Sequence, residues 1–148
     1  MSHSFSVNRV QVVFSTKRRQ RQIPPDVQPK LWAYMAGIAT NRRIEIEAIG
    51  GTDDHVHLVL TLPPVLTLAK AIQEIKAISS KWMRETGHTD FAWQEGYAAF
   101  SIGQSQLEAV VQYVKTQEEH HRKHGFEAEF LSLLAKHRVA YDPKYVFG

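Results

Sequence analysis

Two histidines separated by one residue, His55 and His57, stand at the head of an apolar run that ends at Leu62. In an extended strand alternate side chains share a face, so the two imidazoles would point the same way, about 6.6 Å apart along the chain. That arrangement suits two ligands of one metal ion. Since the chain has no cysteine, other ligands must come from His, Asp, Glu or Gln. Alone, an HxH pair is a weak signal, and a solvated strand face is its ordinary explanation.

A second reactive group lies on a predicted helix near the C-terminus. Ser105 to Glu108 forms a capping box, so we expect a helix from Gln106 to about His124, roughly 28 Å long, with Gly125 as its C-cap. At about 100° per residue, Gln117 falls about 40° from Tyr113, beside a valine-rich sector. Two imidazoles and a Gln carbonyl suit Mg²⁺ or Mn²⁺ and can accept Zn²⁺. A tyrosine attacking phosphorus at such an ion would form a covalent phosphotyrosine.

The elements that would position these groups follow an alternating order. Val-rich or alternating segments predict strands over residues 5–16, 43–48, 55–62 and 97–102, and helical spacing predicts helices over 27–41, 67–86 and 126–137. The order strand, helix, strand, strand, helix, strand predicts an α+β fold, with a ferredoxin-like four-stranded antiparallel sheet (βαββαβ) and a long C-terminal catalytic helix. We expect Ile44, Ile46 and Ala48 to face the first two helices and both histidines to face away.

Composition and charge narrow the class of protein. The 148 residues predict one domain, 1–148, and no apolar run approaches the ~20 residues of a membrane span, so we expect an intracellular, cytoplasmic protein. Residues 1–43 carry eight basic side chains against one acidic, and the remainder ten against fourteen, which gives +7 and −4. A basic loop supplies the best candidates for contacts with phosphates of a nucleic acid: Lys17, Arg18, Arg19 and Arg21. Phe91 and Trp93 either stack on unpaired bases or close a core edge.

Four segments together resemble the single-tyrosine HUH transposases of bacterial insertion sequences, the IS200-like family. They are His55-Val56-His57, Tyr113 to Gln117, Phe91-Ala92-Trp93-Gln94-Glu95-Gly96-Tyr97, and Ser15 to Arg19. The resemblance covers residues 5 to about 129. It implies a homodimer, with active sites possibly shared between chains, that cuts and rejoins single-stranded DNA at hairpin-marked element ends.

The resemblance also implies a role for each matched residue. His55, His57 and Gln117 would hold a divalent Mg or Mn ion, and Tyr113 would form a 5′-phosphotyrosine and release a 3′-OH. Glu118, His120 and Asp54 stay open as further contributors to the site. Two other functions stay open as well: a nucleic-acid-binding relative that no longer transposes, and a metal-dependent phosphoesterase in which Tyr113 takes no part.

Overall fold

A computed structural model describes residues 4–117, 119 and 125–147. Its strands are β1 (Asn8–Ser15), β2 (Glu45–Gly51), β3 (His55–Leu62) and β4 (Ala98–Ser101). Its helices are α1 (Gln28–Asn41), α2 (Leu68–Glu85), α3 (Leu107–Lys115) and α5 (Phe126–Lys136), with short 3-10 turns η1 (Lys17–Arg19) and η2 (Gln104–Gln106). None of the described helices is long and apolar enough to cross a membrane.

The four strands form one antiparallel sheet in the order β2-β3-β1-β4, which confirms the predicted α+β, ferredoxin-like arrangement. The two central strands, β1 and β3, are buried along most of their length. Their register places Ser15 opposite His55 and Val13 opposite His57. The paired histidines therefore lie on an interior strand, where neighbours on both sides fix their positions.

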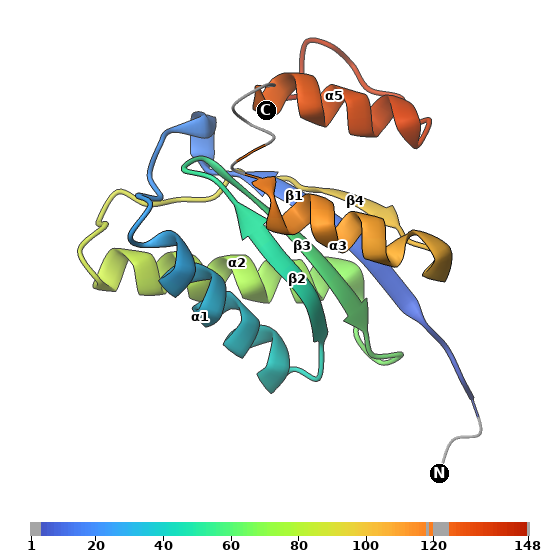
Figure 1. The fold of residues 1–148 in the computed structure, drawn as a ribbon. Helices are drawn as coiled ribbons and strands as arrows, with labels where there is room; N and C mark the ends of the chain where they lie inside the picture. The colour runs from blue at the N-terminus through green and yellow to red at the C-terminus, as the bar shows by residue number, and fades with distance from the viewer. Residues whose placement is uncertain (1–3, 118, 120–124, 148) are drawn as a thin grey trace.

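Helices α1 and α2 cover one face of the sheet, as Figure 1 shows. Their apolar side chains join Val12, Phe14 and Leu58 in the main hydrophobic cluster. The sequence explains where these helices begin: Pro29 occupies the first turn of α1, and the Thr67 side chain accepts a hydrogen bond from the backbone N–H of Lys70. This half of the fold matches the prediction closely.

Strand β2 differs from the prediction at its centre. A β-bulge between Ile46 and Ala48 shifts the register, so that Ala48 faces α3 while Ile49 joins the main cluster. The expectation that Ile44, Ile46 and Ala48 share one face is therefore wrong at Ala48. Gly50 lies within the strand rather than in a turn, and α3 packs directly on its backbone.

The histidine face of the sheet is covered by α3 and α5 (Figure 1). Helix α3 begins through η2, with Gly103 rather than Ser105 as the residue before the turn, and it ends at Lys115. It is thus shorter than the predicted helix to His124, and residues 118 and 120–124 of that prediction lie outside the described residues. Gly125 is the N-cap of α5, not a C-cap, because its carbonyl accepts from the backbone N–H of Glu129.

Candidate metal and nucleophile site

The paired histidines are fully buried. His55 and His57 each have 0% exposed area, and their ring centroids lie 5.3 Å apart. The Phe126 ring of α5 stacks on His55, with centroids 4.6 Å apart. The explanation of an HxH pair as polar residues on a solvated strand is therefore wrong for this chain.

One nitrogen of each imidazole is held by a neighbouring side chain. His55 Nδ1 lies 2.8 Å from Asp54 Oδ1 and 2.9 Å from Thr52 Oγ1. His57 Nδ1 lies 3.2 Å from the amide nitrogen of Gln11, a nearly buried residue of β1. These contacts orient both rings, so that their Nε2 atoms point toward α3 and α5. Metal-binding histidines are usually oriented by partners of this kind.

Gln117 reaches the same space from the chain after α3. Its amide nitrogen donates to the backbone carbonyl of Tyr113, which turns its Oε1 toward His55 Nε2 at 3.2 Å. Because the Asp54 carboxylate can only accept at Nδ1, the His55 tautomer that carries its proton on Nδ1 presents a lone pair at Nε2 toward the Gln117 oxygen. Two acceptors then face each other, an arrangement that a proton or a cation between them would stabilise.

A carboxylate missing from the sequence prediction completes this group. Glu129 of α5 is 9% exposed, and its Oε1 lies 2.8 Å from His57 Nε2 and 3.8 Å from His55 Nε2. The sequence did hold a signal, because Glu129 interrupts the apolar stripe of Phe126, Phe130 and Leu133 at helical spacing. A charged residue on the buried face of a helix needs a partner, and here the partner is the histidine pair.

Tyr113 lies beside the histidines within the same chain. Its ring centroid is 5.7 Å from that of His57, and its hydroxyl donates a hydrogen bond to Glu129 Oε2. Burial, followed by the hydrogen bond and the charge of Glu129, raises the pKa of Tyr113 well above its ordinary value. In this arrangement the phenol keeps its proton and is held in place by the carboxylate.

The donor set fits a divalent cation. Ligand atoms of His55, His57 and Glu129 all lie within 4.8 Å of one another, and the Gln117 side-chain oxygen lies 3.2 Å from one of them, His55 Nε2. Two imidazoles with a carboxylate and an amide oxygen are borderline-to-hard ligands, which suits Mn²⁺, Mg²⁺ or Zn²⁺. The Gln11 side chain can also orient His57 when a metal ion is bound. With the amide group flipped, its oxygen would accept a hydrogen bond from Nδ1–H of His57.

The four basic candidates lie at the end of β1, in and after η1. Lys17 and Arg18 are exposed, whereas the Arg19 guanidinium pairs with Glu127 of α5 and lies over the Phe147 ring. Arg21 lies 3.6 Å from Asp53, next to the histidine strand. The loop thus borders the site, with two of its cations turned toward acidic residues.

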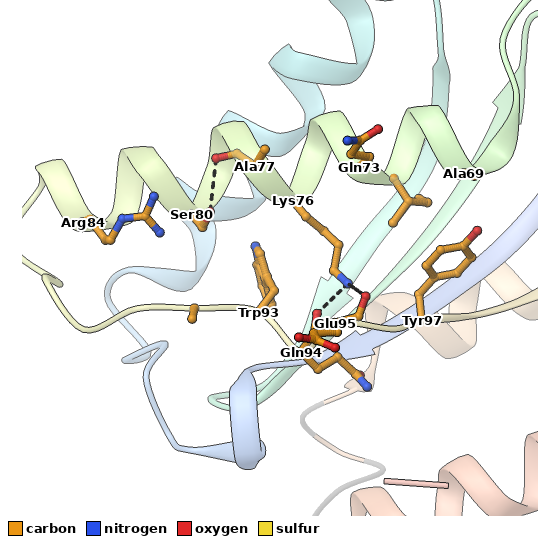
Figure 2. Close-up of a pocket in the computed structure, with 12 residues that line it drawn as sticks. Ala69, Gln73, Lys76, Ala77, Ser80, Arg84, Trp93, Gln94, Glu95 and Tyr97 are labelled. Carbon is orange, nitrogen blue, oxygen red and sulfur yellow. Dashed lines mark hydrogen bonds between the residues drawn. The ribbon is translucent and has the colours of Figure 1, made fainter. Parts of the chain in front are cut away.

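The segment 91–97 acts as a structural brace in the described chain. Phe91 and Trp93 are buried and pack edge to face, so of the two predicted roles the core edge holds and base stacking does not. Figure 2 shows Lys76 of α2 reaching this segment, where its Nζ donates to the carbonyls of Gln94, Glu95 and Gly96. The Gln94 side chain in turn accepts from the backbone N–H of Ser15, at the end of β1 opposite His55.

One comparison with known proteins identifies a family. The model of the family described as "Transposase IS200 like" matches residues 4–117. Among the curated proteins no sequence matches the chain.

Two solved structures share the fold at 20% identity. One, from Deinococcus radiodurans R1, is described as "a putative transposase"; its TM-score is 0.64, over 79% of this chain and 95% of that one. The other is a REP-associated tyrosine transposase bound to a REP hairpin, with a TM-score of 0.60 over 85% of this chain and 76% of that one.

Proposed function

Since the chain belongs to the IS200-like transposase family, we propose that it cuts and rejoins single-stranded DNA with Tyr113 as the nucleophile. One observation carries the proposal: the Tyr113 hydroxyl, the His55–His57 pair and the Gln117 amide converge in a single chain. The helix that bears the tyrosine need not come from a partner to complete this site. We also propose that residues 1–148 form a single domain.

We assign His55, His57, Gln117 and Glu129 as the residues that would hold a divalent ion, Mg²⁺ or Mn²⁺. When bound, such an ion supplies positive charge to a phosphate oxygen and to the oxygen of the leaving group. Asp54 and Gln11 orient the two imidazoles from behind and are positioning residues.

The proposed reaction has two steps, and in each step one bond to phosphorus replaces another. The Tyr113 oxygen attacks the scissile phosphorus, a tyrosine–phosphate bond forms, and the bond from phosphorus to the 3′-oxygen of the upstream nucleotide breaks. The phenolic proton passes to Glu129 Oε2, which already accepts its hydrogen bond, and the released 3′-oxygen takes a proton from solvent water. Attack by a 3′-OH on the 5′-phosphotyrosine reverses these changes and rejoins DNA.

For the substrate we propose single strands with hairpins at the ends of an element. This choice is supported by the similarity in fold to the transposase bound to a hairpin. It is also supported by the position of the basic loop, which borders the proposed site. Lys17 and Arg18 are exposed to contact phosphates, while Arg19 and Arg21 must exchange their acidic partners to do so. The protein would act in the compartment that holds the DNA, which for the expected intracellular chain is the cytoplasm.

The homodimer implied by the resemblance stays a prediction. Because Tyr113 and the four proposed ligands lie together within one chain, the proposed chemistry does not require active sites shared between chains. Sedimentation velocity with and without hairpin DNA would measure the state directly. A monomer that cleaves DNA would exclude an obligatory dimer.

The proposal is tested by a covalent-adduct assay. The protein is incubated with single-stranded DNA from the flanks of its gene and Mn²⁺ or Mg²⁺, then run on a denaturing gel. We expect a shifted protein–DNA band that is lost with EDTA and in Tyr113→Phe but kept in the control Tyr141→Phe, an exposed tyrosine.

The outcomes separate the alternatives. Hairpin binding with no adduct in the wild type identifies a relative that no longer transposes. Phosphodiester hydrolysis that survives Tyr113→Phe identifies a phosphoesterase built on the His–His–Glu group. Equal cleavage of duplex DNA would contradict a single-strand substrate.

A further inference from the structure

A cavity of about 420 Å³ opens between α3, α5 and the β4 edge of the sheet, directly beside Tyr113. This volume lies within the range of ~300–1,000 Å³ that is usual for small-molecule sites. Ile102 and Ala109 line it from the side of the sheet and α3, and Leu133 lines it from α5. We call it the α3–α5 pocket.

The lining matches a flat heterocycle. Apolar side chains supply two walls, while Ser105, Gln106 and Lys136 add hydrogen-bonding groups. Unpaired bases are bound in this way by proteins that act on single strands: the faces of the ring meet apolar or aromatic side chains and its edge meets polar groups. A phosphate alone would gain little from the apolar walls.

Two residues connect the pocket to the site. Tyr113 lines the pocket and donates its hydroxyl to Glu129, and Gln11 lines it while its amide contacts His57. A ligand in the pocket therefore lies against the tyrosine that carries the attacking oxygen and against a positioning residue of the metal site.

We propose that the α3–α5 pocket holds the base of a nucleotide adjoining the scissile phosphate and sets the base preference at that position. The inference rests on the proposed function and adds to it the residues that select the cleavage site. Gln106 is the specificity-determining group: its Oε1 accepts from the backbone N–H of Gly103 at 3.4 Å, and its amide nitrogen and the second lone pair of the oxygen can meet a base edge.

The test fills the pocket and removes the base separately. Ala109→Phe places a large side chain in the pocket from an exposed position of α3, and Gln112→Phe, exposed on the same helix but outside the pocket, is the matched control. Adduct formation is measured on a cleavable strand and on versions with an abasic nucleotide at either side of the cut. Mn²⁺ affinity is measured in parallel to confirm an intact metal site.

We expect one abasic substitution to slow the wild type and Gln112→Phe about tenfold, the size of a good base contact. In Ala109→Phe the same substitution should change nothing further, because the pocket is already filled. Gln106→Ala should relax the base preference at that one position in a randomised library, read as the ratio of the four bases among the adducts that form.

The failures are distinguishable. If the wild type forms no adduct on any strand, the proposed function fails and this inference with it. If the wild type forms adducts and abasic strands affect Ala109→Phe as they affect the wild type, the proposed function stands and the inference is overturned. If Ala109→Phe forms no adduct at all, Gln106→Ala decides, and an unchanged preference overturns the inference.

Discussion

Replacing Glu129 by glutamine should separate the metal-binding role of this residue from its role in packing. The substitution keeps the size of the side chain and removes a nearly buried negative charge that lies 2.8 Å from His57 Nε2. Loss of a partner that only orients a ligand weakens metal binding 10–100-fold. For a direct anionic ligand we take the upper figure, about 100-fold in the dissociation constant for Mn²⁺.

The change in Mn²⁺ affinity can be measured as a change in the thermal stability of the protein. At Mn²⁺ equal to 100 times the wild-type dissociation constant, binding stabilises the fold by about 2.7 kcal/mol. With 100-fold weaker binding the same concentration gives only about 0.4 kcal/mol. For a chain of this size the Mn²⁺-induced rise in Tm should fall from about 5–10 °C to about 1–2 °C.

The assay is differential scanning calorimetry over a Mn²⁺ titration, checked by isothermal titration calorimetry. Glu108→Gln, which removes an exposed carboxylate of α3, serves as the control and should match the wild type. A wild-type Mn²⁺ affinity in Glu129→Gln would refute the assignment of Glu129 as a ligand.

Three further predictions concern the frame around the site. A Cβ at Gly50 would lie 2.0 Å from a backbone oxygen of α3, so Gly50→Ala should lower the free energy of unfolding, measured by urea denaturation, by about 3 kcal/mol. A Cβ at Gly37 of α1 would meet nothing within 4 Å, so the control Gly37→Ala should raise the same free energy by about 0.5–1 kcal/mol. The slope of log affinity against log salt for single-stranded DNA is negative, and replacing Lys17 and Arg18 by alanine should make it less steep by about 1.4; an unchanged slope would exclude their contact with phosphates. Burial, partly opposed by Glu95, lowers the pKa of Lys76 from 10.5 to about 8. The unfolded chain then binds more protons between about pH 8 and 10.5, so stability should rise with pH there relative to Lys76→Met, as denaturation at several pH values would measure.

Much of the sheet was predictable because its signals are local. Each signal acts within a few residues: alternation in β2, the apolar run after His55, the proline in the first turn of α1 and the Thr67 cap. The order of these elements along the chain then predicted the sheet topology. The bulge in β2 was not predictable in this way, since it depends on how Ala48 and Gly50 meet α3. The end of α3 at Lys115 was likewise not predictable, because no glycine or proline follows in the sequence before Gly125.

The sequence predicted the two residue pairs of the site but not Glu129 and Gln11, which hydrogen-bond to them. Spacing alone placed Tyr113 and Gln117 on one side of a helix and His55 and His57 on one side of a strand, and the structure brings all four together. Glu129 was missed because it lies on a separate helix, beyond residue 117, where the match to the family model ends. Gln11 was missed because a single polar residue in an apolar strand has many explanations.

The stacking of Phe126 on His55 makes the site observable in solution. An aromatic ring whose centroid lies 4.6 Å from that of the imidazole, inclined by 28°, shields the protons of His55 through its ring current. The imidazole resonances should therefore lie upfield of those of an ordinary histidine. Their chemical shifts give a direct spectroscopic record of whether α5 keeps its place when metal or DNA arrives.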